Sequence, residues 1–170
     1  GKQFSKDRRI GSLIDRVRVI ERRDVDELIL LDIAATPNGR GPRFDLISEV
    51  CSNLFCPVTV GGGVRTIDDI RQLLNSGADK VSIGTAALER PEFITEASDK
   101  LGAQAVVVSV DVREGQVYGR CGVLDSGIDA RGACREAEAK GAGEILLTSI
   151  ERDGTLSGLD IAGIREIATS

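Results

Sequence analysis

"VTVGGGVRTIDDIRQLLNSGADKVSIGTAA", residues 58–87, contains two short β-branched runs on either side of a segment with apolar residues at helical spacing. Thr66 and Asp69 have the spacing of a capping box at the start of that helix. A strand, a helix and a second strand in such close succession predict two parallel strands joined by a helical crossover. The three glycines at residues 61–63 lie where the first strand passes into the helix.

The same alternation continues along the chain in both directions. Besides residues 57–60 and 80–83, further strands are predicted at residues 27–33, 105–112 and 144–150. Helical patterns occupy residues 10–23, 47–54, 91–101, 129–140 and the end of the chain from about 159. Residues 113–127 predict a small hairpin. Five strands with helical crossovers predict an α/β fold with a parallel sheet, and the near-continuous apolar run at residues 27–33 is typical of a strand buried on both faces. Because composition does not shift along the chain, we expect residues 1–170 to form a single domain.

Composition excludes several classes of protein. The chain has 170 residues, a net charge of −5 and no block of basic residues, which is unfavourable for nucleic-acid binding. No apolar run reaches the roughly 18 residues that span a bilayer, and the first residues lack the apolar core of a signal peptide. The four cysteines form no CxxC pair and histidine is absent, so we expect reduced thiols, a cytoplasmic protein, no metal and no cofactor. The absence of methionine indicates a piece of a longer reading frame.

Polar residues follow the predicted strands at their carboxyl ends. Asp32, Gly84, Asp111 and Thr148 each occupy such a position, and Asp153 lies just beyond the last one. Because the carboxyl ends of parallel strands lie on one face of a sheet or barrel, these residues are expected to converge.

The glycine-rich strand ends predict a phosphate site. Gly61, Gly62 and Gly63, together with Gly84 and Thr85 after the next strand, would expose backbone N–H groups to an anion at the start of a helix. The alternative is a sharp turn with no ligand. A dinucleotide fingerprint and a Walker P-loop are both absent.

Carboxylates are the candidates for acid–base chemistry. Asp32 and Asp111 end long apolar strands, where desolvation would raise the pKa toward neutrality. The alternative for each is a structural aspartate bonded to loop amides. "ERDGT", residues 151–155, is either a simple turn or a loop whose Asp153 and Thr155 reach a ligand.

The runs "DELILLDIAAT", "PVTVGGGVRT", "GAQAVVVSVDV" and "GAGEILLTSIERDGTLSG" resemble the cyclase subunit of imidazole glycerol phosphate synthase. The resemblance implies a (β/α)8 TIM barrel, of which this chain holds about five strands, equivalent to the second through sixth. It also implies a lyase of histidine biosynthesis. Such an enzyme takes ammonia from a glutaminase subunit and uses it to cleave and cyclise a phosphorylated aminoimidazole carboxamide ribonucleotide.

The resemblance assigns roles to individual residues. Asp111 matches one of two aspartates that act as general acid and base, and the other precedes this chain. Supporting positions near the reacting centre are matched by Asp32, Thr148 and Asp153. Phosphate contacts are matched by Gly63, Thr85 and Gly154. Members of a charged ammonia gate are matched by Glu27, Lys80 and Glu144. Without the resemblance, Glu27 and Lys80 would be ordinary solvated charges at strand starts.

Some features leave alternatives open. Gly84 replaces the family's usual asparagine, and "RDGTLSG" also occurs in the sister isomerase of the same pathway. The start of the chain is similar to cyclase-like paralogues that pass ammonia to sugars of surface polysaccharides. A third alternative is an inactive barrel fragment, because five strands cannot close an eight-stranded barrel.

Overall fold

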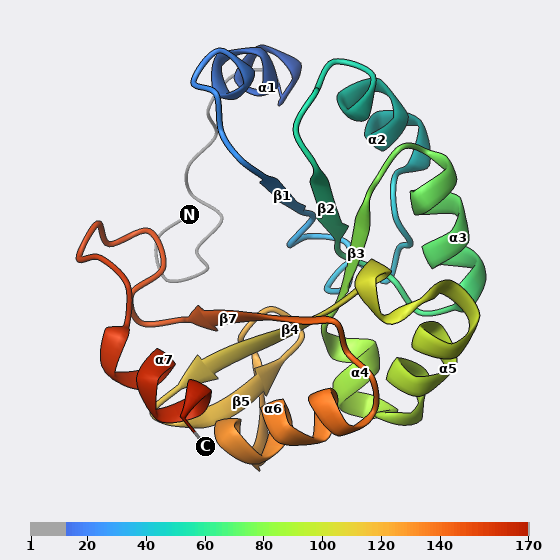
Figure 1. Cartoon of the computed structure of the whole chain (residues 1–170). Helices are drawn as coiled ribbons and strands as arrows, with labels where there is room; N and C mark the ends of the chain where they lie inside the picture. Colours follow the sequence, from blue (N-terminus) through green and yellow to red (C-terminus); the bar gives the residue numbers. More distant parts are fainter. Residues whose placement is uncertain (1–12, 170) are drawn as a thin grey trace.

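The computed structural model describes residues 13–169, which form one curled seven-stranded sheet with helices on its outer side (Figure 1). Five strands are parallel and lie in the order in which they occur in the sequence. They are β1 (Leu28–Leu31), β2 (Val58–Gly61), β3 (Lys80–Ile83), β4 (Val106–Arg113) and β7 (Glu144–Ser149). All five predicted parallel strands are therefore confirmed.

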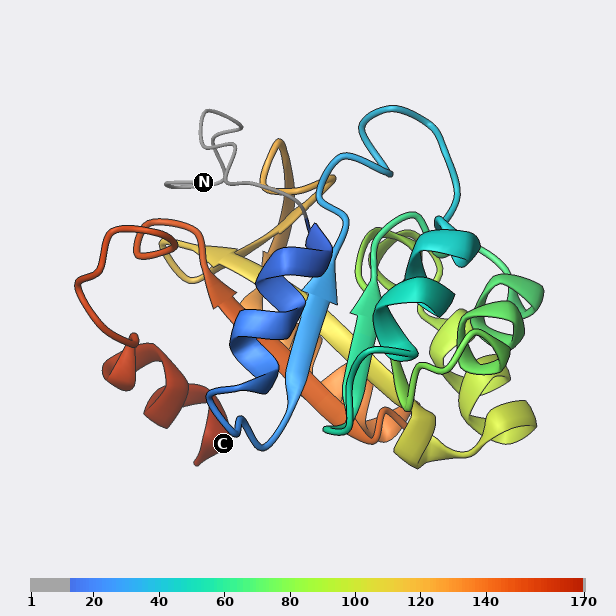
Figure 2. The ribbon, with the colours of Figure 1, turned by 90° about the horizontal axis from the view of Figure 1, so that it is seen from above.

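The predicted hairpin is also confirmed. Strand β4 continues into β5 (Gln116–Gly119) and β6 (Leu124–Asp129), which pair antiparallel. Since β4 pairs with β3 only through Val106–Val108 and with β5 through Asp111–Arg113, the hairpin projects from the parallel part of the sheet at the carboxyl end of β4. Figure 2 shows it on the same side of the molecule as the loop that follows β1.

The helices occupy the crossovers that the sequence predicts. They are α1 (Leu13–Glu21), α2 (Phe44–Cys51), α3 (Ile67–Asn75), α4 (Thr85–Glu89), α5 (Glu92–Leu101), α6 (Ala130–Ala139) and α7 (Ile161–Ala168), with a 3₁₀ turn at Ala103–Ala105. The first was predicted over residues 10–23, of which 10–12 lie outside the described residues. Helix α4 was not predicted, because five residues are too few to show a helical period. None of the helices in residues 13–169 is long and apolar enough to cross a membrane.

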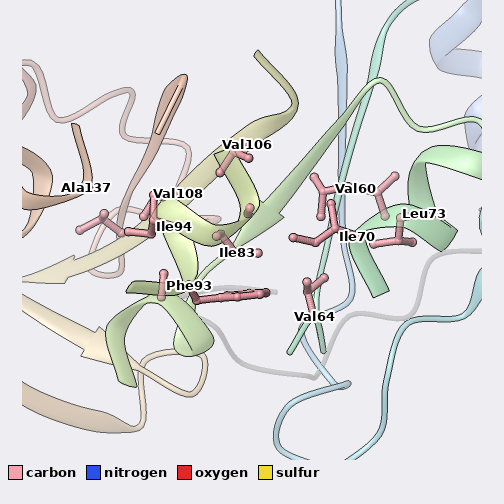
Figure 3. Close-up of a cluster of buried hydrophobic side chains, with 14 of the residues drawn as sticks. Val60, Val64, Ile70, Leu73, Ile83, Phe93, Ile94, Val106, Val108 and Ala137 are labelled. Atoms are coloured by element: carbon pink, nitrogen blue, oxygen red, sulfur yellow. The ribbon is translucent and has the colours of Figure 1, made fainter. Parts of the chain in front are cut away.

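The core lies between the outer face of the sheet and these helices (Figure 3). Strand residues alternate, so Val81 and Ile83 are buried against the helices whereas Lys80 and Ser82 face the inner side. Thr66 and Asp69 form the predicted capping box, in which the Asp69 amide donates to Thr66 Oγ1 at 3.1 Å and the Thr66 amide donates to Asp69 Oδ2 at 2.9 Å.

The inner face of β1 departs from the prediction. Ile29 and Leu31 are 43% and 40% exposed, so the expectation of a strand buried on both faces is wrong for the described chain. The two side chains point to the concave side of the curled sheet, where they line a cavity.

Candidate active site

The carboxyl ends of the five parallel strands surround a cavity of about 900 Å³. The structure brings together there eight of the predicted site residues, from five strand ends and the loops that follow them. They are Asp32, Gly62, Gly63, Gly84, Thr85, Asp111, Thr148 and Asp153. The predicted convergence is therefore observed.

Asp111 is the most perturbed acid of the cavity. It lies directly opposite Thr148 in the parallel pairing of β4 with β7, which places both side chains on the inner face. The pKa of Asp111 is raised to about 6. Burial is the largest cause and the negative charge of Asp153 also raises the pKa, whereas the hydroxyl of Thr148, which donates to the carboxylate, lowers it. The expectation of a raised pKa is thus met at Asp111, and the group can take or give a proton near neutral pH.

The same expectation is wrong for Asp32. Burial raises its pKa, but hydrogen bonds from Arg40 and from the amide of Ala34, together with the charges of Arg40 and Arg43, lower it below its ordinary value. Arg40 Nη2 donates to Asp32 Oδ1 at 2.8 Å, and Arg40 Nη1 lies 2.7 Å from Asp32 Oδ2 as an ion-pair contact. Asp32 therefore stays ionised and is suited to hold charge in place rather than to transfer a proton.

The glycines at the end of β2 are compatible both with a tight turn and with an anion site, the two interpretations that the sequence left open. Gly62 has a φ of +109°, and a Cβ there would lie 2.4 Å from the Asp32 carbonyl oxygen. Gly63 has a φ of +75°, and a Cβ there would lie 2.7 Å from the Arg40 carbonyl oxygen. The close approach is thus made by the loop after β1. Within residues 13–169, the amides of Gly63 and Val64 donate to no loop carbonyl or side chain, so they remain available to an anion. Gly61 does not itself line the cavity; a Cβ there would meet the side chains of Leu31 and Ser82, which do line it.

The second predicted phosphate loop begins at the end of β3. A Cβ on Gly84 would meet the Ser109 Cβ at 3.6 Å, an ordinary contact, so the position can hold a side chain. Thr85 Oγ1 accepts a hydrogen bond of 3.0 Å from the amide of Arg120, in the turn between β5 and β6.

The loop after β7 contributes less than predicted. Asp153 lines the cavity, whereas Gly154 and Thr155 do not. Thr155 Oγ1 instead donates to the carbonyl of Arg152 at 2.8 Å and lies 2.6 Å from Ser157 Oγ. These contacts are those of a turn, which was the alternative interpretation of "ERDGT".

Several cavity residues were missed by sequence reasoning. They are chiefly Arg65, Arg90, Ser109, Arg120 and Cys121. Strand alternation would have found Ser109, two positions before Asp111 on the same face. The hairpin turn offers no such signal, since its approach to the cavity depends on contacts with Thr85 and with Ile33, far away in the sequence.

Glu27, Lys80 and Glu144 meet at the opposite end of the inner face, where the strands begin. Lys80 Nζ lies 2.6 Å from Glu144 Oε1 and 3.2 Å from Glu27 Oε1. The pKa of Lys80 is raised, chiefly by its hydrogen bond to Glu144. The pKa of Glu27 is lowered, chiefly by a hydrogen bond of 2.7 Å that Thr59 donates to it. Thr148 lies four positions after Glu144 on β7, about 13 Å along the strand.

The chain matches the histidine biosynthesis protein family over residues 1–170. It belongs to this family. Members of the family are TIM barrels, of which this chain is a part. Three relatives are named imidazole glycerol phosphate synthase subunit HisF. That of Dictyoglomus thermophilum is 47% identical over 165 residues, that of Dictyoglomus turgidum 46% over 165, and that of Sulfurisphaera tokodaii 46% over 164. Each match covers 94% of this chain and 66% of the relative, so the chain spans just under two thirds of these proteins.

Proposed function

We propose that this chain is the greater part of the cyclase subunit of an imidazole glycerol phosphate synthase. In this proposal its five parallel strands are the second through sixth of an eight-stranded barrel formed by a single domain. The observation that carries the proposal is Asp111, an acid with a pKa of about 6 in a cavity at the carboxyl ends of the strands. Catalytic groups of TIM barrels occupy this end of the fold.

Asp111 is proposed as a proton-transfer group of the ammonia-dependent cleavage and cyclisation. A pKa near the working pH lets one carboxyl group accept a proton from one atom of the substrate and return it to another. Thr148 holds the carboxylate through its hydroxyl, and burial, together with the charge of Asp153, keeps the proton affinity of Asp111 high. Asp32 is proposed to remain a carboxylate beside the reacting centre, fixed by Arg40.

The glycine-rich strand ends are proposed to hold a phosphate group of the ribonucleotide. Gly63 and Val64, whose amides are uncommitted, line the same cavity as Thr85, whose hydroxyl can donate to a phosphate oxygen. Gly61 and Gly62 allow the close backbone packing, and Gly154 and Thr155 are proposed to serve the second phosphate once the barrel is complete.

The cluster of Glu27, Lys80 and Glu144 is proposed as the entry for ammonia from a glutaminase subunit. The name of the relatives is that of one subunit of a synthase, which supports a partner of this kind. Both ion pairs lie at the strand-start end of the inner face, and in this proposal the passage of ammonia requires Lys80 to move. Biosynthesis of this type takes place in the cytoplasm, where we place the protein.

The test is turnover of the phosphoribulosyl-formimino ribonucleotide by the intact gene product, with ammonium salt in place of the glutaminase. We expect imidazole glycerol phosphate as a product and at least a 100-fold loss of kcat in Asp111→Asn. No turnover by a folded protein would refute the proposal and favour amidation of a polysaccharide sugar, which the same assay with that sugar would detect.

The gate is tested separately. Lys80→Ala leaves the catalytic end untouched, so we expect turnover with ammonium salt to stay within twofold. Turnover driven by glutamine through the glutaminase is expected to change several-fold. Equal effects on both would contradict an ammonia gate.

A further inference from the structure

The turn between β5 and β6 lies against the cavity although it does not follow any of the five parallel strands. Arg120 and Cys121 line the cavity, and both have left-handed backbone with φ of +52° and +58°. Two successive residues other than glycine in this region are unfavourable unless neighbouring contacts hold them. The turn is therefore fixed by its surroundings rather than by its own sequence.

Two contacts hold the turn across the cavity. The amide of Arg120 donates to Thr85 Oγ1 at 3.0 Å, and the thiol of Cys121 donates to the carbonyl of Ile33 at 3.2 Å. Thr85 follows β3 and Ile33 follows β1, so the turn connects two strand ends that border the cavity. Because Thr85 Oγ1 accepts the bond from Arg120, its own hydrogen can be donated to an acceptor in the cavity.

The guanidinium of Arg120 has a weak partner. It lies 3.2 Å from Glu89 Oε1, and the two side chains are 59% and 53% exposed. An ion pair this exposed contributes little, and a phosphate offers the guanidinium fork a stronger, bidentate partner. Glu89 also lines the cavity, so Arg120 can exchange one partner for the other without leaving its rim.

The other arginines at this rim are held elsewhere. Arg65 donates to the carbonyl of Gly39, and Arg90 pairs with Glu96 while its guanidinium stacks 4.9 Å from the ring centroid of Phe93. Arg120 thus differs from these arginines, because its ion-pair partner, Glu89, also lines the cavity.

We propose that Arg120 is an anion-binding residue. Its guanidinium releases Glu89 and binds the same substrate phosphate that Gly63 and Thr85 bind. This inference rests on the proposed function, because it assumes a phosphorylated substrate in the cavity. The turn then sets specificity for a phosphate over an uncharged group at that end of the substrate.

Titration with inorganic phosphate tests the proposal, followed by the ¹H–¹⁵N amide signals of Gly63 and Thr85. Arg120→Asn removes the charge but tolerates left-handed backbone, so the fold is expected to persist. We expect phosphate binding to weaken at least tenfold in Arg120→Asn and to recover partly in Arg120→Lys. Arg71→Asn, which breaks an exposed ion pair on α3 away from the cavity, is the matched control and is expected to have no effect.

A second variant separates binding from structure. Glu89→Gln breaks the same ion pair as Arg120→Asn but frees the guanidinium, so we expect phosphate to bind three- to tenfold more tightly. That gain should vanish when Glu89→Gln is combined with Arg120→Asn. A purely structural ion pair would instead make both single variants change in the same direction, which would overturn the proposal.

The outcomes also distinguish this inference from the proposed function. If phosphate shifts the Gly63 and Thr85 signals equally well in the protein and in Arg120→Asn, the phosphate site stands and the role of Arg120 is refuted. If phosphate shifts neither signal in the unaltered protein, both the role of Arg120 and the phosphate site are refuted.

Discussion

Removing the charge of Asp111 is expected to stabilise the protein and, under the proposed function, to abolish catalysis. The carboxylate is partly buried, accepts from Thr148 and lies near the negative charge of Asp153. Ionising it is therefore unfavourable in the folded state. Asparagine has nearly the same shape and its carbonyl can still accept from Thr148, so Asp111→Asn removes this cost without creating a cavity.

The size of the effect follows from the pKa. A folded-state pKa of about 6 against an ordinary 3.8 is a difference of about two, and each pKa unit corresponds to about 1.4 kcal/mol. Because the folded pKa is raised, the folded state holds the proton more tightly. Stability is then greatest below pH 4 and falls as the pH rises toward and through 6. The free energy of unfolding of Asp111→Asn relative to the unaltered protein should thus rise by about 3 kcal/mol between pH 3.5 and pH 7.5.

Urea denaturation at several pH values in this range measures the difference, and the other carboxyl groups cancel between the two proteins. Asp99→Asn, on the exposed side of α5, removes the same charge without burial and serves as the matched control. A difference that stays constant within about 0.5 kcal/mol across this range would refute the reasoning, because it would mean that Asp111 ionises as easily in the folded as in the unfolded state.

Three further changes test the local structure around the site. Thr66→Ala removes half of the capping box of α3 and should cost about 1 kcal/mol of unfolding free energy in urea denaturation, whereas Thr66→Ser should cost much less. Gly63→Ala places a Cβ 2.7 Å from the Arg40 carbonyl oxygen at φ +75°, so a loss of about 2 kcal/mol or more is expected, and a neutral result would contradict the packing described here. Arg40→Ala should raise the pKa of Asp32, measured from its carboxyl ¹³C signal, and an unchanged midpoint would mean that Arg40 does not hold that carboxylate.

The parallel sheet could be predicted from the sequence because each strand and helix is encoded by local residues. The apolar runs and the Thr66 capping box are consequences of neighbouring side chains alone. Convergence of Asp111 and Thr148 also followed, since parallel strands bring their carboxyl ends to one side.

What could not be predicted depends on residues far apart in the chain. The pKa of Asp32 is decided by Arg40, which lies in a turn whose path the sequence does not specify. The position of Arg120 depends on its bond to Thr85, 35 residues earlier. The exposure of Ile29 and Leu31 is likewise a property of the curled sheet rather than of the apolar run.

The two aspartates at the ends of β1 and β4 illustrate how similar positions acquire different chemistry. Asp32 forms an ion pair with Arg40, just as Glu27 forms one with Lys80 at the other end of the inner face. Among the ion pairs of residues 13–169, none includes Asp111, whose charged neighbour is the carboxylate of Asp153. Environments that push the pKa values of two acids apart assign them different roles, one as a fixed charge and one as a proton carrier. By this reasoning we propose Asp111 as the described acid of the cavity that transfers a proton, and Asp32 as a carboxylate that stays ionised beside Arg40.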